Sequence, residues 1–153
     1  MQHKITILQA RVQGYSLVEV VIVLACGAIL LVVATPNLHH LQQEWALWES
    51  ARVLETSLHW GRMYAISANA PIMFEVSEDG QRFYWVDPAS GDKYENTDRH
   101  LSGQIRIVGF PKRPIRLYQH GNAVPAGTYI LCGETGSYRV VVSPGGRIRL
   151  QKD

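Results

Sequence analysis

The sequence predicts an α+β protein in which a long N-terminal helix packs on a C-terminal antiparallel β-sheet domain. Three observations carry this prediction. An almost wholly apolar run extends from Leu17 to Ala34, apolar residues at helical spacing continue to about Ala68, and short alternating segments separated by turn residues follow Pro71. The 153 residues leave room for one globular domain beside the apolar run.

The apolar run predicts a membrane-spanning helix over residues 15–36. About 20 apolar residues are needed to cross the hydrocarbon layer, and Glu19 is the only charged residue in the run. A carboxylate there costs about 2.5–3.5 kcal/mol on insertion scales, so Glu19 predicts a compensating partner. Lys4 and Arg11 precede the run without an acidic residue, which predicts a cytoplasmic N-terminus and an exported C-terminal part.

Three other interpretations explain only part of this run. A secretory signal would have a shorter apolar core that ends at a small-residue cleavage site. A lipoprotein signal is suggested by Leu24-Ala25-Cys26, but eight apolar or glycine residues follow Cys26 where a polar tether is expected. A generic single-span anchor explains the apolar residues but gives no common reason for Gly14, Tyr15 and Glu19.

Residues 37–68 predict an amphipathic helix that continues the span. Apolar residues form two stripes at helical spacing, one of Leu38, Leu41, Trp45 and Trp48, the other of Leu47, Ala51, Leu54, Leu58 and Ala65. Two stripes predict two partners: the sheet of the same chain and adjacent subunits. The alternative is a single broad core face. Asn69-Ala70-Pro71 is expected to end the helix, because proline lacks an amide donor and restricts the residue before it.

The remaining region, residues 69–153, predicts a β-rich domain. Residues 71–77 and 82–87 flank a turn that contains Gly80, which predicts a hairpin. The polar stretch 88–102 is expected to be a loop. Further strands are expected at 105–108, 115–118, 128–132, 138–142 and 147–150. Between the last two, Ser143 to Gly146 predicts a type II turn in which Gly145 takes the positive φ.

Charge divides the exported part into two halves. Ten acidic and four basic residues lie between Glu44 and Asp98, whereas nine basic and two acidic residues lie between Arg99 and Asp153. Alternation places Arg147 and Arg149 on one strand face and Arg116 on the outer face of another strand. If these strands are neighbours, a basic outer face results. Such a face could bind phosphate backbones or pair with the acidic half of another subunit. The third alternative is a solvated surface without a partner.

The sequence shows no pattern typical of an enzyme or a metal site. It contains no glycine-rich phosphate loop, no Cys-x-x-Cys and no His-x-x-x-His, and the carboxylates between Glu75 and Asp98 lie on expected turns and loops. We therefore expect no enzymatic activity, no metal and no other cofactor. Cys26 lies inside the expected span and Cys132 outside it, so no intrachain disulfide is expected.

The N-terminal segment resembles the class III signal of type IV prepilins and pseudopilins. It has a short basic leader, a glycine, an aromatic residue, and a glutamate at the fifth position after the cleavage point. The resemblance implies that a prepilin peptidase removes residues 1–14 by cleaving after Gly14 and methylates the new amino group of Tyr15, where the family usually has phenylalanine. It also implies that Pro36 kinks the helix and that Glu19 pairs with the terminal ammonium of a neighbouring subunit during assembly.

The C-terminal part resembles the GspH/FimT family, which comprises minor pseudopilins of type II secretion and minor pilins of type IV pili. Residues 115–121, 127–132 and 140–149 carry this resemblance. It implies a type IV pilin-like fold and a non-enzymatic filament subunit whose partners are other pilins or pseudopilins. The implied location is the bacterial inner membrane, with a single span and a periplasmic C-terminal domain. The favoured function is in the type II secretion pseudopilus.

The alternative function is that of a FimT-like minor pilin that binds DNA for uptake. In the FimT branch a Gly-Arg-x-Arg segment is associated with DNA capture, and Gly146-Arg147-Ile148-Arg149 matches it residue by residue. Arg147 and Arg149 are therefore the first candidates for DNA contacts, with Arg116 and Arg139 as secondary ones. Family members with a second soluble cysteine can pair it with one near Cys132, but this chain lacks that partner.

Overall fold

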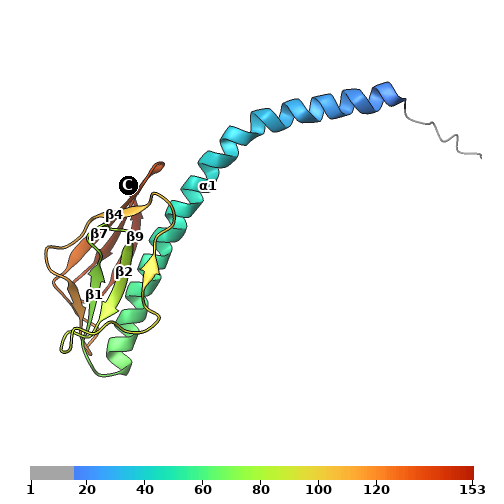
Figure 1. Cartoon of the computed structure of the whole chain (residues 1–153). Helices are drawn as coiled ribbons and strands as arrows, with labels where there is room; N and C mark the ends of the chain where they lie inside the picture. Colours follow the sequence, from blue (N-terminus) through green and yellow to red (C-terminus); the bar gives the residue numbers. More distant parts are fainter. Residues whose placement is uncertain (1–15) are drawn as a thin grey trace, which may run out of the picture. The chain divides into compact units, whose positions relative to one another are not determined.

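The computed structural model describes residues 16–153, with the side chains of residues 33–37 left out. Helix α1 (Leu17–Ser67) is followed by β-strands (Figure 1), which are β1 (Ile72–Val76), β2 (Arg82–Val86), β3 (Arg99–His100), β4 (Arg106–Gly109), β5 (Ile115–Leu117), β6 (Ala123–Val124), β7 (Gly127–Gly133), β8 (Gly136–Val142) and β9 (Ile148–Lys152). The chain divides into two compact units, with the boundary between Leu38 and His39 within α1.

The first unit contains the N-terminal part of α1. The helix begins where the backbone amides of Glu19 and Val20 donate hydrogen bonds to the carbonyl oxygen of Ser16, at 3.0 and 3.3 Å. Within residues 16–32 and 38–153, no helical stretch is both long enough and apolar enough to cross a membrane. Tyr15 and the side chains of residues 33–36 belong to the expected span but lie outside the described residues.

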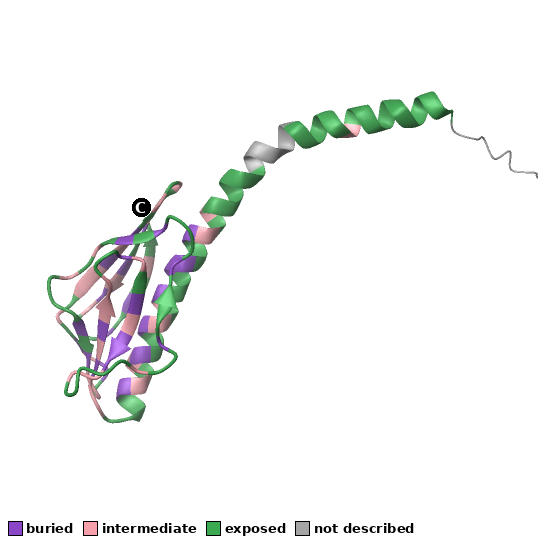
Figure 2. Ribbon diagram, viewed as in Figure 1, coloured by how far each residue is buried: buried purple, intermediate pink, exposed green. Residues whose placement is uncertain are grey.

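In the second unit, α1 buries one apolar stripe and exposes the other (Figure 2). The side chains of the stripe from Leu47 to Ala65 are at most 2% exposed, whereas Leu41, Trp45 and Trp48 are 40–60% exposed. The division into two stripes is therefore confirmed. The assignment of the exposed stripe to adjacent subunits stays a prediction.

Helix α1 ends one residue before the expected position. After Ser67, Asn69 adopts a left-handed conformation with φ of 50°, and the amide of Ala70 donates to the carbonyl oxygen of Ala65 at 3.2 Å. Asparagine tolerates this conformation better than most residues, so it closes the last turn before Pro71 redirects the chain.

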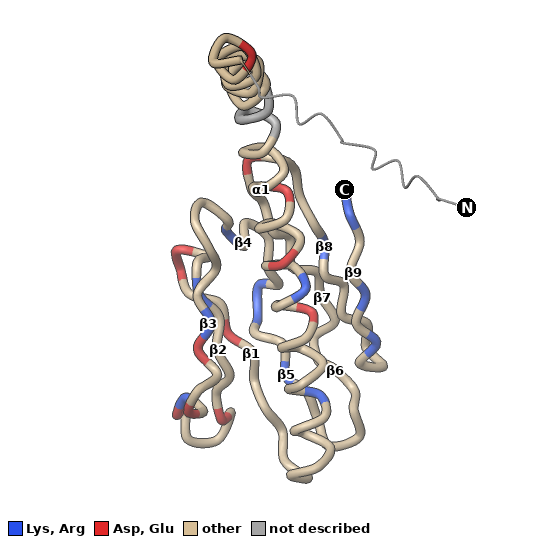
Figure 3. The backbone as a smooth tube through the Cα atoms, turned by 90° about the vertical axis from the view of Figure 1, so that its right-hand side faces the viewer, with Lys and Arg blue, Asp and Glu red and all other residues tan. Residues whose placement is uncertain are grey.

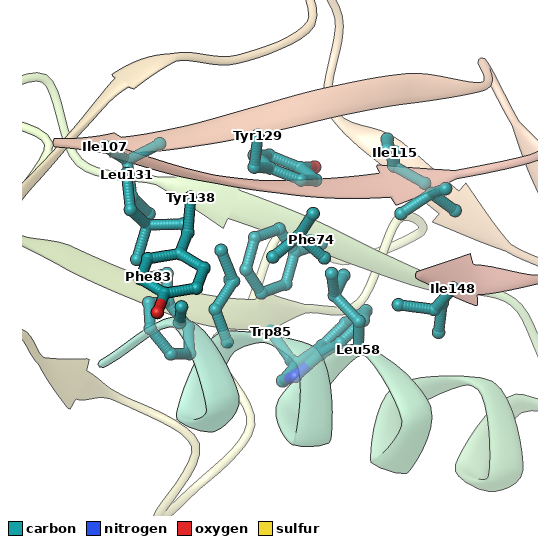
Figure 4. Packing of buried hydrophobic residues seen from close by; sticks show 14 of the residues in the cluster. Leu58, Phe74, Phe83, Trp85, Ile107, Ile115, Tyr129, Leu131, Tyr138 and Ile148 are labelled. Atoms are coloured by element: carbon teal, nitrogen blue, oxygen red, sulfur yellow. The ribbon is translucent and has the colours of Figure 1, made fainter. Parts of the chain in front are cut away.

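The strands form two antiparallel sheets with the orders β3-β2-β1-β5-β6 and β4-β7-β8-β9. An aromatic cluster joins them, and Leu54 and Leu58 of α1 belong to the same core (Figure 4). The ring of Phe74 on β1 lies 4.9 Å from that of Trp85 on β2 and 5.2 Å from that of Tyr129 on β7, both in edge-on geometry. Such pairs add about 0.5–1.5 kcal/mol each to the burial of their area.

The stretch expected to be a loop, residues 88–102, contains a short edge strand. Strand β3 pairs with Arg82 and Phe83 of β2, and Lys93 forms an isolated bridge with Val86. The hydroxyl of Thr97, which is 8% exposed, accepts from the amide of Trp85 at 3.3 Å and donates to the carbonyl of Tyr94 at 2.7 Å. A polar side chain of this stretch thus provides a hydrogen-bond partner for the backbone of β2. Strand β3 was not expected because its two residues are too few to show an alternating pattern. Strand β6 is equally short and was not expected.

The turn between β8 and β9 differs from the expected type II turn. The amide of Gly146 donates to the carbonyl of Ser143 at 2.9 Å, but the positive φ, 71°, belongs to Gly146 and not to Gly145. This arrangement is a turn followed by a left-handed glycine, which is the usual geometry of three-residue hairpin loops. The expectation for Gly145 was wrong because both glycines permit the conformation and only the strand register selects one.

Candidate functional site

The predicted processing and assembly residues lie in the N-terminal unit. Gly14 and Tyr15 fall outside the described residues, and Pro36 lies within α1 with an undescribed side chain. Glu19 is exposed in the first turn of α1, where the helix dipole favours a negative charge. Its carboxylate forms no ion pair with a described residue. It is therefore available to a cation from another molecule.

The second sheet has one buried face and one solvent-facing face. Its buried face is formed by every second residue along the four strands, namely Ile107, Tyr129, Leu131, Tyr138, Val140, Val142 and Ile148. In the intervening positions, the pairs Arg106 with Cys132, Ile130 with Arg139, and Val141 with Arg149 are direct cross-strand partners. Partners in an antiparallel sheet point to the same side. These six residues therefore form one surface, which we name the basic face.

The basic face contains an arginine that sequence reasoning missed. Arg106 on β4 lies on the same side of the sheet as Arg139 on β8 and Arg149 on β9. Arg106 alternates with Ile105 and Ile107, so its outward direction was visible in the sequence. The pairing of β4 with β7 was not visible, and this pairing alone brings Arg106 into line with the other two.

The sequence-predicted arginines do not all lie together. Arg116 lies on β5 of the first sheet, opposite Met73 and Val124, so its strand is not a neighbour of β9. The condition for one continuous basic face that includes Arg116 and Arg149 is thus not met. Arg147 precedes β9 in the turn, and its side chain is exposed.

Arg139 differs from its neighbours because a carboxylate already occupies its guanidinium. Its Nε donates to Oδ2 of Asp153 at 2.8 Å, and its Nη2 pairs with Oδ1 of the same residue. The hydroxyl of Ser137 donates to the same carboxylate at 3.1 Å. By contrast, Arg106, Arg147 and Arg149 form no ion pair with a described residue. These three arginines hold the uncompensated charge of this region.

A network of hydrogen bonds positions the turn that carries Arg147. The carbonyl of Pro144 accepts from the amide of Ala123 at 2.9 Å. The carbonyl of Gly121 accepts from Nε of Arg62, on α1, at 2.9 Å, and the backbone of Gly146 packs directly against Gly121. The turn is therefore fixed to the helix through the 118–122 segment, so that Arg147 projects from a rigid base.

The opposite end of β9 is held to α1 by an ion pair. Nζ of Lys152 lies 2.6 Å from Oε1 of Glu44. The hydrogen bond from Lys152, together with its charge, lowers the pKa of the Glu44 carboxyl, and Glu44 raises the pKa of Lys152.

We expect Lys152→Gln to return the Glu44 pKa toward the ordinary glutamate value, as measured by NMR titration of the carboxyl carbon. Because the pKa of Glu44 is lower when folded, its contribution to stability is present above the unfolded value and is lost as the pH falls through the folded value. The difference in stability between the wild type and Lys152→Gln should therefore shrink between about pH 5 and pH 2. A stability difference that is the same at about pH 5 and pH 2 would contradict a contribution from the ion pair between Lys152 and Glu44. Arg149→Gln, a charge removal on the same strand, is the control.

A groove lies beside the exposed stripe of α1. It has a volume of about 500 Å³ between the helix and residues 95–99, and Trp48 and Trp60 line it together with Arg52 and Arg99. Trp48 belongs to both the groove and the exposed stripe, so the two form one surface. Among the described residues, no three His, Cys, Asp or Glu side chains are placed to hold a metal ion.

The chain is similar to known proteins in both its sequence and its fold. A family model described as type II transport protein GspH matches residues 50–146, and one described as a prokaryotic N-terminal methylation motif matches residues 9–35. No curated protein sequence matches the chain.

Two solved structures illustrate the likeness in fold. The type IV minor pilin FimU of Pseudomonas aeruginosa is 20% identical with a TM-score of 0.59, and the match covers 69% of this chain and 87% of that one. The minor pseudopilin EpsH of the Vibrio cholerae type 2 secretion system is 17% identical with a TM-score of 0.58, covering 69% and 96%. The expected type IV pilin-like fold is therefore confirmed.

Proposed function

The chain belongs to the GspH family of type IV pilin-like filament subunits, and from this premise we propose that it acts as a minor pseudopilin of type II protein secretion. The observation that carries the proposal is the exposed apolar stripe of α1, opposite the stripe that covers the sheets. A helix with two apolar faces can pack on its own domain and on a neighbouring subunit at the same time. The role is structural and requires no catalysis or cofactor.

In this proposal the N-terminal segment anchors the subunit in the bacterial inner membrane. A prepilin peptidase cleaves after Gly14 and methylates Tyr15, in agreement with the methylation motif matched over residues 9–35. The N-terminus lies in the cytoplasm and the second unit in the periplasm. The carboxylate of Glu19 then pairs with the terminal ammonium of another pilin or pseudopilin, which offsets the cost of burying either charge alone.

We expect Glu19→Leu to leave the protein in the membrane fraction but to reduce its recovery with other filament subunits at least about tenfold, because breaking a buried ion pair costs several kcal/mol. The measurement is co-purification from cells that express the complete secretion system. Val18→Leu, a change in the same helical turn without loss of charge, is the control. Unchanged recovery of Glu19→Leu would remove the role proposed for this carboxylate.

A second candidate function is DNA capture by a minor pilin of a type IV pilus. The observation in its favour is that Arg147 and Arg149 are exposed and form no ion pair with a described residue. Phosphate binding by such side chains is electrostatic and falls steeply with salt concentration.

We expect duplex DNA, if it is the ligand, to be retarded by the purified protein at low salt and less so by the double variant Arg147→Gln and Arg149→Gln. The plot of log K against log salt concentration has a negative slope. Its magnitude should decrease by about 0.9 for each DNA phosphate that an arginine no longer neutralises. Arg139→Gln removes one positive charge, from a guanidinium that Asp153 already occupies, so it is the control for the loss of one arginine. No retardation at low salt would remove this candidate.

A further inference from the structure

One surface segment of the second unit has a clear excess of acidic residues. Residues 87–98 contain Asp87, Asp92, Glu95 and Asp98 against a single lysine. None of the four carboxylates forms an ion pair with a described residue, and all but Asp87 are exposed. The lysine, Lys93, has its ammonium 3.6 Å from the ring centre of Tyr84. The segment therefore presents an uncompensated negative surface.

The basic face lies elsewhere on the same unit. In Figure 3, β2, β3 and their loops lie on one side of α1 and include several acidic positions, whereas β9 runs on the other side of α1. Because the two surfaces do not overlap, one copy of the chain can offer its acidic segment while its basic face receives another. Contacts of this head-to-tail kind are heterologous, and they propagate along filaments.

The composition of the basic face favours a protein partner over a bare phosphate backbone. Between its arginines lie Ile130 and Val141, both of which are half-buried, as is Thr128 beside Val141. Arginine around a partly apolar centre is typical of protein interfaces. A nucleic-acid surface depends chiefly on positive charge along the phosphate path.

We propose that the basic face of one copy docks the acidic segment 87–98 of a second copy of this chain. Arg149 and Arg106 meet the carboxylates of Asp92, Glu95 and Asp98, and Ile130 and Val141 supply the apolar contact. This inference rests on the proposed filament role for its setting, although the contact itself can be measured on the purified protein.

A competing explanation gives the arginines a protective role. Strand β9 is an edge of its sheet, and charged residues on an edge strand discourage unwanted pairing with other strands. The two explanations predict opposite effects. Removing a charge that guards an edge should increase self-association, whereas removing a charge that binds the acidic segment should decrease it.

The test uses the full-length chain in detergent, with the native thiol of Cys132 as a reporter within the basic face. Cys26→Ala removes the other cysteine, and Ala89→Cys places a thiol in the acidic segment at an exposed turn position. Chains with two different tags are mixed and treated with a short bis-maleimide. We expect linked dimers that contain both tags at low salt, and fewer of them as salt screens the contact.

Charge reversal identifies the residues that make the contact. We expect Arg149→Glu to lower the yield of mixed dimers by about fivefold, the upper range for one surface ion pair, and Asp92→Lys in the partner to restore it. Arg116→Glu makes the same change on the other sheet and should have no effect. The absence of mixed dimers at low salt, or an equal or higher yield with Arg149→Glu, would overturn the proposal.

Two further results separate this inference from the functions proposed above. Dimers that are indifferent to Arg149, combined with DNA retardation that depends on it, would assign the face to nucleic acid and overturn the docking proposal. Glu19→Leu should form mixed dimers as well as the parent chain does. If it does so but is not recovered with the filament, the docking contact stands independently of the assembly step.

Discussion

Gly146→Ala is expected to lower the free energy of unfolding of the second unit by about 2–4 kcal/mol. This value adds the cost of a non-glycine residue in the left-handed conformation to the cost of local overpacking. Gly146 has φ of 71°, and a β-carbon added there would collide with the carbonyl oxygen of Gly121 and come within 2.9 Å of Nε of Arg62. The collision is not easily relieved, because Arg62 and the amide of Ala123 hold both sides of the contact by hydrogen bonds.

The neighbouring glycine supplies a matched control. Gly145 has no atom within 4 Å of its β-carbon position and no positive φ, so Gly145→Ala should change the stability by less than about 0.5 kcal/mol. Both variants can be compared by denaturant unfolding of the full-length chain in detergent, with tryptophan fluorescence as the signal. Equal losses of stability in the two variants would show that the turn is not fixed against the 118–122 segment.

This pair of glycines also bears on the Gly-Arg-x-Arg segment. The close approach to Gly121 explains the glycine at 146 by packing alone, without any ligand. What remains for a binding role is the pair of exposed arginines, Arg147 and Arg149. A binding assay on Gly146→Ala alone would therefore confuse a disrupted turn with a weakened arginine–ligand interaction.

The helix was predictable because its signal is local. Apolar spacing of three and four residues is visible in any short window, and it distinguished the stripe that contains Leu54 from the stripe that contains Trp45. Burial in the structure follows this division, at 0% exposure for Leu54 and 60% for Trp45. The end of the helix at Ser67 was similarly marked by the proline four residues later.

The basic face was only partly predictable because its signal is not local. Alternation shows which way Arg106, Arg116 and Arg149 point from their own strands, but not which strands are neighbours. The structure places β4 and β9 in one sheet and β5 in the other. Arg106 therefore joins the face and Arg116 does not, although the two residues look alike in sequence.

The second large effect is expected at Trp85, which anchors the core that joins the helix to both sheets. Its side chain is 0% exposed, its Nε1 donates to the hydroxyl of Ser57 at 3.1 Å, and its ring lies against Gly61, where the absence of a side chain lets α1 approach. Trp85→Ala removes the ring from this packing and leaves a cavity. We expect a decrease of about 3–5 kcal/mol in the free energy of unfolding.

Trp45→Ala is the matched comparison because it removes the same kind of side chain from the exposed stripe of α1. We expect it to change the unfolding free energy by less than about 1 kcal/mol, since the indole is 60% exposed. If the stripe contacts other subunits, Trp45→Ala should nevertheless reduce recovery of the protein with the filament. Thermal unfolding and co-purification, measured on both variants, distinguish the two roles. A Trp45→Ala protein that is both stable and fully recovered would show that subunit packing does not use this side chain. Trp85→Ala should perform worse than the wild type in both assays, because a larger fraction of its molecules is unfolded.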